Sequence, residues 1–307
     1  MRIEGLTYNN VLTQGVKRRA WLREHSPEHL EQCQELMLRA LARRGPATSP
    51  ATLVLGAGAC TEVPLESLAR ASDEVLLVDL DLASLKQGRA ELSAQGLRRR
   101  IQPVQEDLSG GVSKSLYELL SALPWRTLVD RGGEALFSAL ADCLNACPVP
   151  DPPQLPELAP GTFGTVISSL VLTQLFGYPL LDVLDEVQRV APRLLGEQER
   201  HRAYQDAAQH FRLRVIRAHL SLLKQLADAG GTLVLLSDVR GFVFNVSGTD
   251  HDASHRRAIP LVPHAFFQLV RETFQVLEER RWEWLSDLPE GERPGRGYEV
   301  VGYLLSR

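Results

Sequence analysis

Two glycines and an aspartate in the first third of the chain have the spacing of a nucleotide-binding turn. In "TLVLGAGACTEVPLESLARASDEVLLVDLD", Gly56 and Gly58 directly follow one apolar run, and Asp79 ends the next. In a strand–turn–helix unit, glycines let the backbone turn tightly and approach a ligand, while an acidic residue after the next strand accepts hydrogen bonds from ribose hydroxyls. The separation of roughly 20 residues matches that arrangement. The pattern predicts a nucleoside-containing cofactor, either NAD or S-adenosylmethionine.

Three further features favour S-adenosylmethionine. Thr61 stands where a dinucleotide fold needs its third glycine, and Glu62 would place a carboxylate near the turn, which suits an ammonium better than a pyrophosphate. The third predicted strand ends in "QEDL", where the carboxylate of Asp107 is able to accept from an adenine amino group. Two strands follow the last long helix, an order in which a final antiparallel strand joins a seven-stranded sheet.

The elements that must position these residues alternate between strands and helices. We expect strands at residues 52–56, 74–79, 101–107, 163–172, 230–239, 281–287 and 298–307. Predicted helices include residues 27–44, 65–71, 82–94 and 264–280. This alternation predicts an α/β, doubly wound and mostly parallel sheet with helices on both faces.

Two segments stand outside this alternation. Residues 1–50 form a helical N-terminal extension, and residues 51–307 form the Rossmann-like domain. Within that domain, residues 108–162 make a connection far longer than usual, so we interpret them as an insertion. The insertion begins with helix-like sequence and ends in the proline-rich "CPVPDPPQLPELAP", which excludes a central strand or helix.

With these motifs in place, the chain resembles the class I S-adenosylmethionine-dependent methyltransferase superfamily. The resemblance covers residues 52 to 307 in element order and identifies no particular member. It implies S-adenosylmethionine as cofactor and methyl transfer as activity, with a seven-stranded sheet whose last strand is antiparallel. The cofactor-binding residues that we assign with it are Gly56, Ala57, Gly58, Glu62, Asp79, Leu80, Asp107, Leu108, Ser168 and Ser169.

The first motif departs from the family pattern at two positions. The family often has an acidic residue where this chain has Val54, and a third glycine where it has Cys60. A non-catalytic subunit that binds S-adenosylmethionine without turnover is therefore an alternative to an enzyme. An NAD(P)-dependent oxidoreductase is a further alternative, although it has no need of Asp107.

The loop after the fifth predicted strand leaves the sheet edge where ligands bind in open α/β sheets. It carries His251 and His255, and a neutral histidine is able to take a proton from an acceptor near pH 7. We predict that His251 or His255 is the catalytic base; solvated surface histidines are the competing interpretation. Asp252 between them also admits a metal site, but we expect none.

The acceptor is expected to be a small or medium-sized organic molecule, methylated on oxygen or nitrogen, with secondary metabolism as one context and a peptide or protein side chain as the alternative. The fourth strand ends in "SSLVLTQ" and lacks the Asn-Pro-Pro-aromatic run of enzymes that methylate bases, while the net charge is −4. Nucleic acid is therefore not an expected partner. Four cysteines fit reduced thiols, and no signal peptide or membrane span is evident, which predicts a cytoplasmic protein. The oligomeric state stays open.

Overall fold

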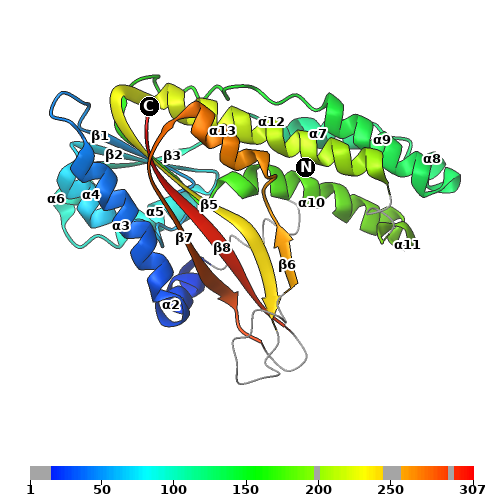
Figure 1. The fold of residues 1–307 in the computed structure, drawn as a ribbon, viewed down its shortest axis with the longest axis horizontal. Coiled ribbons are helices and arrows are strands. Elements are labelled where there is room, and N and C mark those ends of the chain that lie inside the picture. Colours follow the sequence, from blue (N-terminus) through cyan, green and yellow to red (C-terminus); the bar gives the residue numbers. More distant parts are fainter. Residues whose placement is uncertain (1–14, 197–200, 245–256, 290–293) are drawn as a thin grey trace. The chain divides into compact units, whose positions relative to one another are not determined.

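The computed structural model describes residues 15–196, 201–244, 257–289 and 294–307 (Figure 1). The chain divides into two compact units. The sheet unit is drawn from residues 14–106, 156–173 and 223–307, and the helical unit includes residues 107–155 and 174–222.

The sheet unit has the predicted architecture. Its strands run in the order β3-β2-β1-β4-β5-β8-β7, and β6 pairs with β5 outside this path. The strands are β1 (Ala51–Leu55), β2 (Glu74–Asp79), β3 (Ile101–Gln105), β4 (Phe163–Ser169), β5 (Ala227–Phe244), β6 (Arg257–Pro260), β7 (Gln275–Asp287) and β8 (Gly295–Ser306). Strands β1 to β5 form parallel pairs, whereas β8 is antiparallel to β5 and β7. The mostly parallel sheet with an antiparallel last strand is confirmed, and β6 is an eighth strand beyond the seven predicted.

The central strands are buried along their length and consist of apolar and small polar residues. Every residue of β1 and of β4 is buried, as expected for parallel strands covered on both sides. Around this sheet the unit carries α2 (Gly15–His25), α3 (Pro27–Arg43), α4 (Leu65–Ala71), α5 (Leu82–Ala90), α6 (Gln95–Arg98) and α13 (Ala265–Thr273).

Helices cover both faces of the sheet within this unit. Leu304 of β8 belongs to the hydrophobic core that also contains residues of α3, α4 and α5. The next residue back along the strand, Tyr303, faces the other way, and its ring contacts Phe266 of α13. The helix expected at residues 264–280 is present only in its first part. Helix α13 ends at Thr273, Phe274 is extended, and β7 begins at Gln275, so the prediction of helix for residues 275–280 is wrong.

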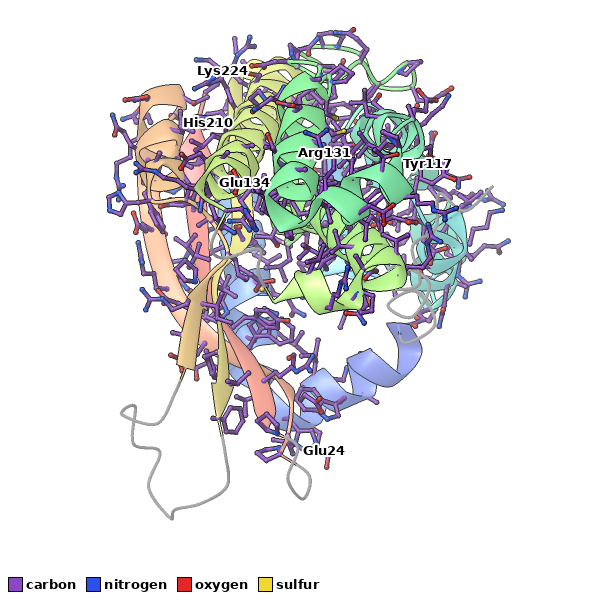
Figure 2. All side chains as sticks on the ribbon, turned by 90° about the vertical axis from the view of Figure 1, so that its right-hand side faces the viewer. Glu24, Tyr117, Arg131, Glu134, His210 and Lys224 are labelled. Atoms are coloured by element: carbon purple, nitrogen blue, oxygen red, sulfur yellow. The ribbon has the colours of Figure 1, made fainter. Side chains whose placement is uncertain are left out.

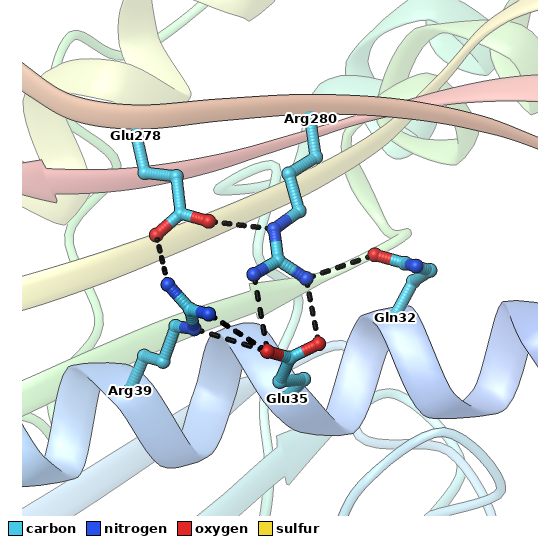
Figure 3. A network of polar contacts seen from close by, with 5 residues as sticks. All are labelled: Gln32, Glu35, Arg39, Glu278 and Arg280. Carbon is cyan, nitrogen blue, oxygen red and sulfur yellow. Dashed lines mark hydrogen bonds and ion pairs between the residues drawn. The ribbon is translucent and has the colours of Figure 1, made fainter.

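Helix α3 runs along β7 and β8 (Figure 1) and is fixed there by side chains. Arg280 of β7 donates to Glu35 at 2.8 Å and to Gln32 at 2.9 Å, and Arg39 bridges Glu35 and Glu278 (Figure 3). The N-terminal helix thus belongs to the same compact unit as the sheet. The domain boundary expected at residue 50 is untested and stays a prediction.

The helical unit gathers the predicted insertion with later helices. It contains α7 (Val112–Ser121), α8 (Trp125–Arg131), α9 (Gly133–Ala146), most of α10 (Leu172–Val190), α11 (Pro192–Leu195) and most of α12 (Arg202–Leu226). Arg214 of α12 donates to the carbonyls of Leu144 and Cys147 at 2.6 and 2.8 Å, which ties α12 to the end of α9. Figure 2 shows exposed side chains of this unit, among them Tyr117 and Glu134. Within the described part of the chain, no helix combines the length and apolarity that crossing a bilayer requires.

Candidate functional site

The glycine turn begins directly after β1 and is tied to the end of β2. The backbone N–H groups of Gly56 and Ala57 both donate to the carbonyl of Val78, at 2.9 and 3.2 Å. Gly56 and Gly58 have φ angles of +70° and +46°, in the left-handed region that glycine adopts without steric cost. The turn predicted from the glycine pair is therefore present at the carboxyl end of two neighbouring parallel strands, where ligands bind in such sheets.

The two glycines are needed for different reasons. A Cβ atom at Gly56 would lie 2.3 Å from Cβ of Val171, in the segment that follows β4. A Cβ atom at Gly58 would meet no heavy atom nearer than the Oδ2 atom of Asp79, at 4.0 Å. Gly56 thus allows close packing inside the protein, whereas Gly58 leaves space beside the carboxylate of Asp79.

Asp79 connects the turn to the start of the next helix. Its Oδ2 atom accepts from the N–H of Gly58 at 2.9 Å, and its Oδ1 atom accepts from the N–H of Asp81 at 3.0 Å. Burial raises the pKa of Asp79 above the ordinary 3.8, and these backbone hydrogen bonds limit the rise. A carboxylate has about four lone-pair sites, so it is able to accept further hydrogen bonds from a ligand.

Capping of the helix that follows β2 is the role of Asp81 and not of Asp79. The Asp81 carboxylate accepts from the N–H groups of Ala83 and Ser84, both in the first turn of α5. Because Asp81 satisfies these two unpaired N–H groups, Asp79 is not needed for the cap. The local structure of the helix start is therefore independent of a ligand-binding role for Asp79.

Two residues near the turn hold a backbone conformation that is unfavourable for them. Cys60 has φ +57° and Leu170 has φ +54°, in the left-handed region that costs a residue with a side chain about 1–2 kcal/mol. Cys60 lies two residues after Gly58 and keeps a glycine-like conformation despite its side chain. Such strain gathers at functional sites, which supports a ligand-binding role for this edge of the sheet.

The other predicted cofactor residues of the sheet unit lie in different environments. Ser168 pairs with Leu55 in the sheet register, which places it beside the start of the turn, and Ser168 and Ser169 are both buried. Leu80 is 45% exposed, an unusual position for a large apolar side chain. Glu62 is partly buried after the turn. These placements leave the roles of the four residues as predictions.

Asp107 and Leu108 belong to the helical unit. The Asp107 carboxylate accepts from the N–H and hydroxyl of Ser109 at 2.9 and 2.7 Å and from the N–H of Gly111 at 3.0 Å. It therefore holds the turn that begins α7, using about three of its four lone-pair sites. Leu108 is buried. The predicted contact with adenine is untested, and the local structural role is an addition to it.

The predicted catalytic residues His251 and His255 lie outside the described residues, so their role stays a prediction. Within the described residues, no three His, Cys, Asp or Glu side chains are grouped to hold a metal ion. A shallow groove of about 420 Å³ lies on the outer surface of α2 and α3, between Arg23 and Leu38. It does not include any residue of the glycine turn.

Sequence reasoning missed two parts of this region. One is the close packing of Val171 on Gly56: residues 163–172 were predicted as one strand, but β4 ends at Ser169 and α10 begins at Leu172, so Val171 lies in the turn between them. The other is a buried group of polar and aromatic side chains on α3, β5 and β7. There, Trp282 donates to Nδ1 of His29 at 2.9 Å, and Trp284 donates to Asp238 at 3.0 Å. The two tryptophans, spaced by two residues in a predicted strand, were the available signal.

No family model and no curated protein sequence matches the chain. The chain is similar in structure to the glycopeptide N-methyltransferase MtfA complexed with S-adenosyl-L-methionine, at 14% identity and a TM-score of 0.37, over 89% of this chain and 92% of that chain. A geranyl diphosphate methyltransferase in complex with the same molecule is similar at 9% identity and a TM-score of 0.38, over 89% and 84%. A precorrin 8w decarboxylase from Methanobacterium thermoautotrophicum is similar at 10% identity and a TM-score of 0.35, over 89% and 90%. Identities and TM-scores this low do not identify the ligand of this chain. The assignment of a ligand depends on the residues of the chain itself.

Proposed function

We propose that the chain binds S-adenosylmethionine at the Gly56–Gly58 turn and transfers a methyl group to an oxygen or nitrogen atom of a small or medium-sized organic acceptor. The observation that carries this proposal is the Asp79 carboxylate, which is fixed by the N–H groups of Gly58 and Asp81 at the carboxyl edge of the sheet. A partly buried, oriented carboxylate of this kind suits the two hydroxyls of a ribose.

The residues around Asp79 fit the rest of such a cofactor. The missing side chain of Gly58 leaves room next to the carboxylate, and exposed Leu80 offers an apolar surface for a flat base. Glu62 carries a negative charge beyond the turn, which suits the ammonium of the methionine part. S-adenosylmethionine, when bound, supplies an electrophilic methyl group. The contribution of the chain is to orient the cofactor, and in this proposal the buried Ser168 and Ser169 form the floor of the site.

Calorimetric titration with S-adenosylhomocysteine tests the proposal. The wild-type protein should bind it, and Asp79→Ala should lose about 1.5–3 kcal/mol of binding free energy, as expected for hydrogen bonds to a charged group. Asp73→Asn is the matched control, because Asp73 is exposed and lies just before the opposite end of β2. Binding of NADH in place of S-adenosylhomocysteine, or equal affinities for the wild type and Asp79→Ala, would contradict the assignment.

Methyl transfer is tested separately from binding. A set of amine, phenol and carboxylate acceptors, incubated with labelled S-adenosylmethionine, should give a labelled product with at least one class. The predicted bases enter here: the double variant His251→Ala, His255→Ala should lower kcat about 10²- to 10⁴-fold, the usual contribution of a general base, with cofactor affinity unchanged. Tight cofactor binding without transfer to any acceptor would support the non-catalytic alternative instead.

A further inference from the structure

Asp238 lies where the regular part of β5 ends. Parallel pairing of β5 with β4 stops at Leu236, and the antiparallel register with β8 shifts between Asp238 and Arg240. The carbonyl of the intervening Val239 accepts from the N–H of Leu261 at 3.0 Å. Bulges of this kind occur next to active sites, where they change the direction of a side chain. Asp238 is thus at the same edge of the sheet as the glycine turn.

A tryptophan holds the Asp238 carboxylate in a fixed orientation. The indole N–H of Trp284 donates to Oδ1 of Asp238 at 3.0 Å, and Trp284 itself is only 3% exposed. Trp284 stands on β7, and β8 lies between β7 and β5, so this bond reaches across a whole strand. A buried indole that reaches this far to one carboxylate oxygen gives the carboxylate a defined direction.

Aromatic rings stack beside this carboxylate. The ring of Trp284 stacks on His29 with centroids 4.9 Å apart and on Tyr298 with centroids 5.1 Å apart. Tyr298 is partly exposed, and it pairs with Gly241 of β5, which has no side chain to cover the ring. The stack therefore runs from the core to a ring with accessible surface.

The surroundings of the stack carry negative charge. Burial raises the pKa of the Cys33 thiol, and the negative charges of Glu62 and Asp238 raise it further. The electric fields of both carboxylates therefore reach the Cys33 thiol. Arg240, the next charged residue along β5, is paired with Glu299 at 3.3 Å. A carboxylate beside aromatic rings is the combination that attracts an organic cation, through charge and through the negative faces of the rings.

We infer that Asp238, oriented by the Trp284 N–H, and the partly exposed ring of Tyr298 together bind a positively charged nitrogen of the acceptor, so that the acceptor is an organic cation. This inference rests on the proposed function, because it assigns the second substrate of the same site. It narrows the acceptor to molecules that carry an ammonium group. The methylated atom is an oxygen or nitrogen that has a free lone pair, because the cationic nitrogen has none. Glu62 and Asp238 then serve different ligands: Glu62 the cofactor, and Asp238 the acceptor.

Two probes of equal shape and different charge test this assignment. Choline carries a quaternary ammonium, and 3,3-dimethylbutan-1-ol is its neutral counterpart. Each is titrated by calorimetry or NMR into protein saturated with S-adenosylhomocysteine, which occupies the cofactor site. We expect choline to bind at least about tenfold more tightly than the alcohol, the scale of a partly desolvated cation–π contact with a nearby carboxylate.

Two variants separate the charge from the packing. Asp238→Asn keeps an oxygen that accepts from Trp284 but removes the charge, and it should weaken choline binding about tenfold while S-adenosylhomocysteine affinity is unchanged. Trp284→Phe keeps an aromatic ring but loses the indole N–H. Its choline affinity should lie between the affinities of the wild type and of Asp238→Asn. Asp73→Asn serves as control, and thermal unfolding verifies that each variant is folded.

The results that would overturn this inference differ from the results that would overturn the proposed function. Equal binding of choline and the alcohol, no saturable choline binding, or an Asp238→Asn variant with wild-type choline affinity would each overturn the assignment of a cationic acceptor. Failure of the wild-type protein to bind S-adenosylhomocysteine would overturn the proposed function instead, and the choline titration would still be readable on the protein without it.

Discussion

Two glycine turns follow strands of the sheet, and each is held by an aspartate that accepts a glycine N–H. After β1, Gly58 donates to Asp79 at 2.9 Å; after β3, Gly111 donates to Asp107 at 3.0 Å. The difference is the distance along the chain. Asp79 comes from the next strand, 21 residues after Gly58, whereas Asp107 stands four residues before Gly111.

This difference separates a tertiary contact from a local one. The bond to Asp79 joins the ends of two strands and fixes an edge of the sheet, so the carboxylate is oriented by the fold. The bonds to Asp107 close the turn that precedes α7, whose N-cap residue is Gly111, in the manner of aspartates that bond to the backbone two residues on. An acidic residue after a strand therefore has no single meaning, and substitutions in the two turns should have different effects on folding and on binding.

The largest effect is expected from Gly56→Ala. The added methyl would lie 2.3 Å from Val171 and the residue would have to keep φ +70°, so overpacking and backbone strain add together. We expect a loss of about 3 kcal/mol or more in the free energy of unfolding, measured by chemical denaturation. Gly96→Ala is the control, since a Cβ there meets nothing within 4 Å. Equal stability of the two variants would show that Val171 moves aside without cost.

This part of the fold was readable from sequence because its signals are local. The apolar runs of β1 and β2 and the glycines between them predict strand, turn and strand without further information. The second half of β7 was predicted as a strand at residues 281–287, whereas residues 275–280 were predicted as helix, because "FQVLEER" has helix-forming residues and its strand structure depends on pairing with β8. The packing of Val171 on Gly56 was equally hidden, since no pattern in either segment refers to the other.

Asp79 should give the next largest effect, on binding. Asp79→Ala is expected to lose about 1.5–3 kcal/mol of S-adenosylhomocysteine binding. The affinity of the wild type should also fall on acidification, because the ionised carboxylate is the form that accepts from ribose. Burial raises the pKa of Asp79 above 3.8, so this fall begins at a higher pH than an exposed aspartate would show. A pH-independent affinity down to the acid unfolding range would contradict the assignment.

The same shift has the opposite sign for folding. Because folding raises the pKa of Asp79, the folded state holds the proton more tightly than the unfolded chain does. The free energy of unfolding should therefore decrease as the pH rises through the interval above 3.8, and Asp79→Asn should remove this decrease. Denaturant titrations of both proteins across that interval measure the difference.

A smaller effect is expected from Asp107→Ala, mainly on folding. The variant loses the side-chain hydrogen bonds that close the turn before α7, and losses of this kind cost about 1–2 kcal/mol. Ser109→Ala is the matched control, because the Ser109 hydroxyl accepts from Val112 in the same turn. If Asp107 also contacts adenine, only Asp107→Ala should weaken S-adenosylhomocysteine binding, by about tenfold. Equal affinities for the two variants would leave Asp107 with the local role alone.

The residues of the candidate site could be predicted from the sequence only where a residue has a single structural or functional role. Asp79 was identified by its distance from the glycines, because its hydrogen bond to Gly58 follows from the strand–turn–helix pattern. The second role of Asp107 depends on Ser109 and Gly111, which follow it within four residues and were available to sequence reasoning. The link between Asp238 and Trp284 spans 46 residues and crosses a strand, so only the folded chain shows it.

The smallest effect compares the two turns directly. Gly58→Ala and Gly111→Ala each place a side chain at a left-handed φ, +46° and +93°, so each should lose about 1 kcal/mol of unfolding free energy. Their surroundings differ: a Cβ at Gly58 would lie 4.0 Å from Oδ2 of Asp79, whereas a Cβ at Gly111 meets nothing within 4 Å. The added methyl of Gly58→Ala therefore occupies space beside the proposed ribose site. We expect weaker S-adenosylhomocysteine binding for Gly58→Ala alone, measured by calorimetry on both folded variants. Equal losses of S-adenosylhomocysteine affinity in the two variants would contradict a ligand-binding role that belongs to the Gly58 turn alone.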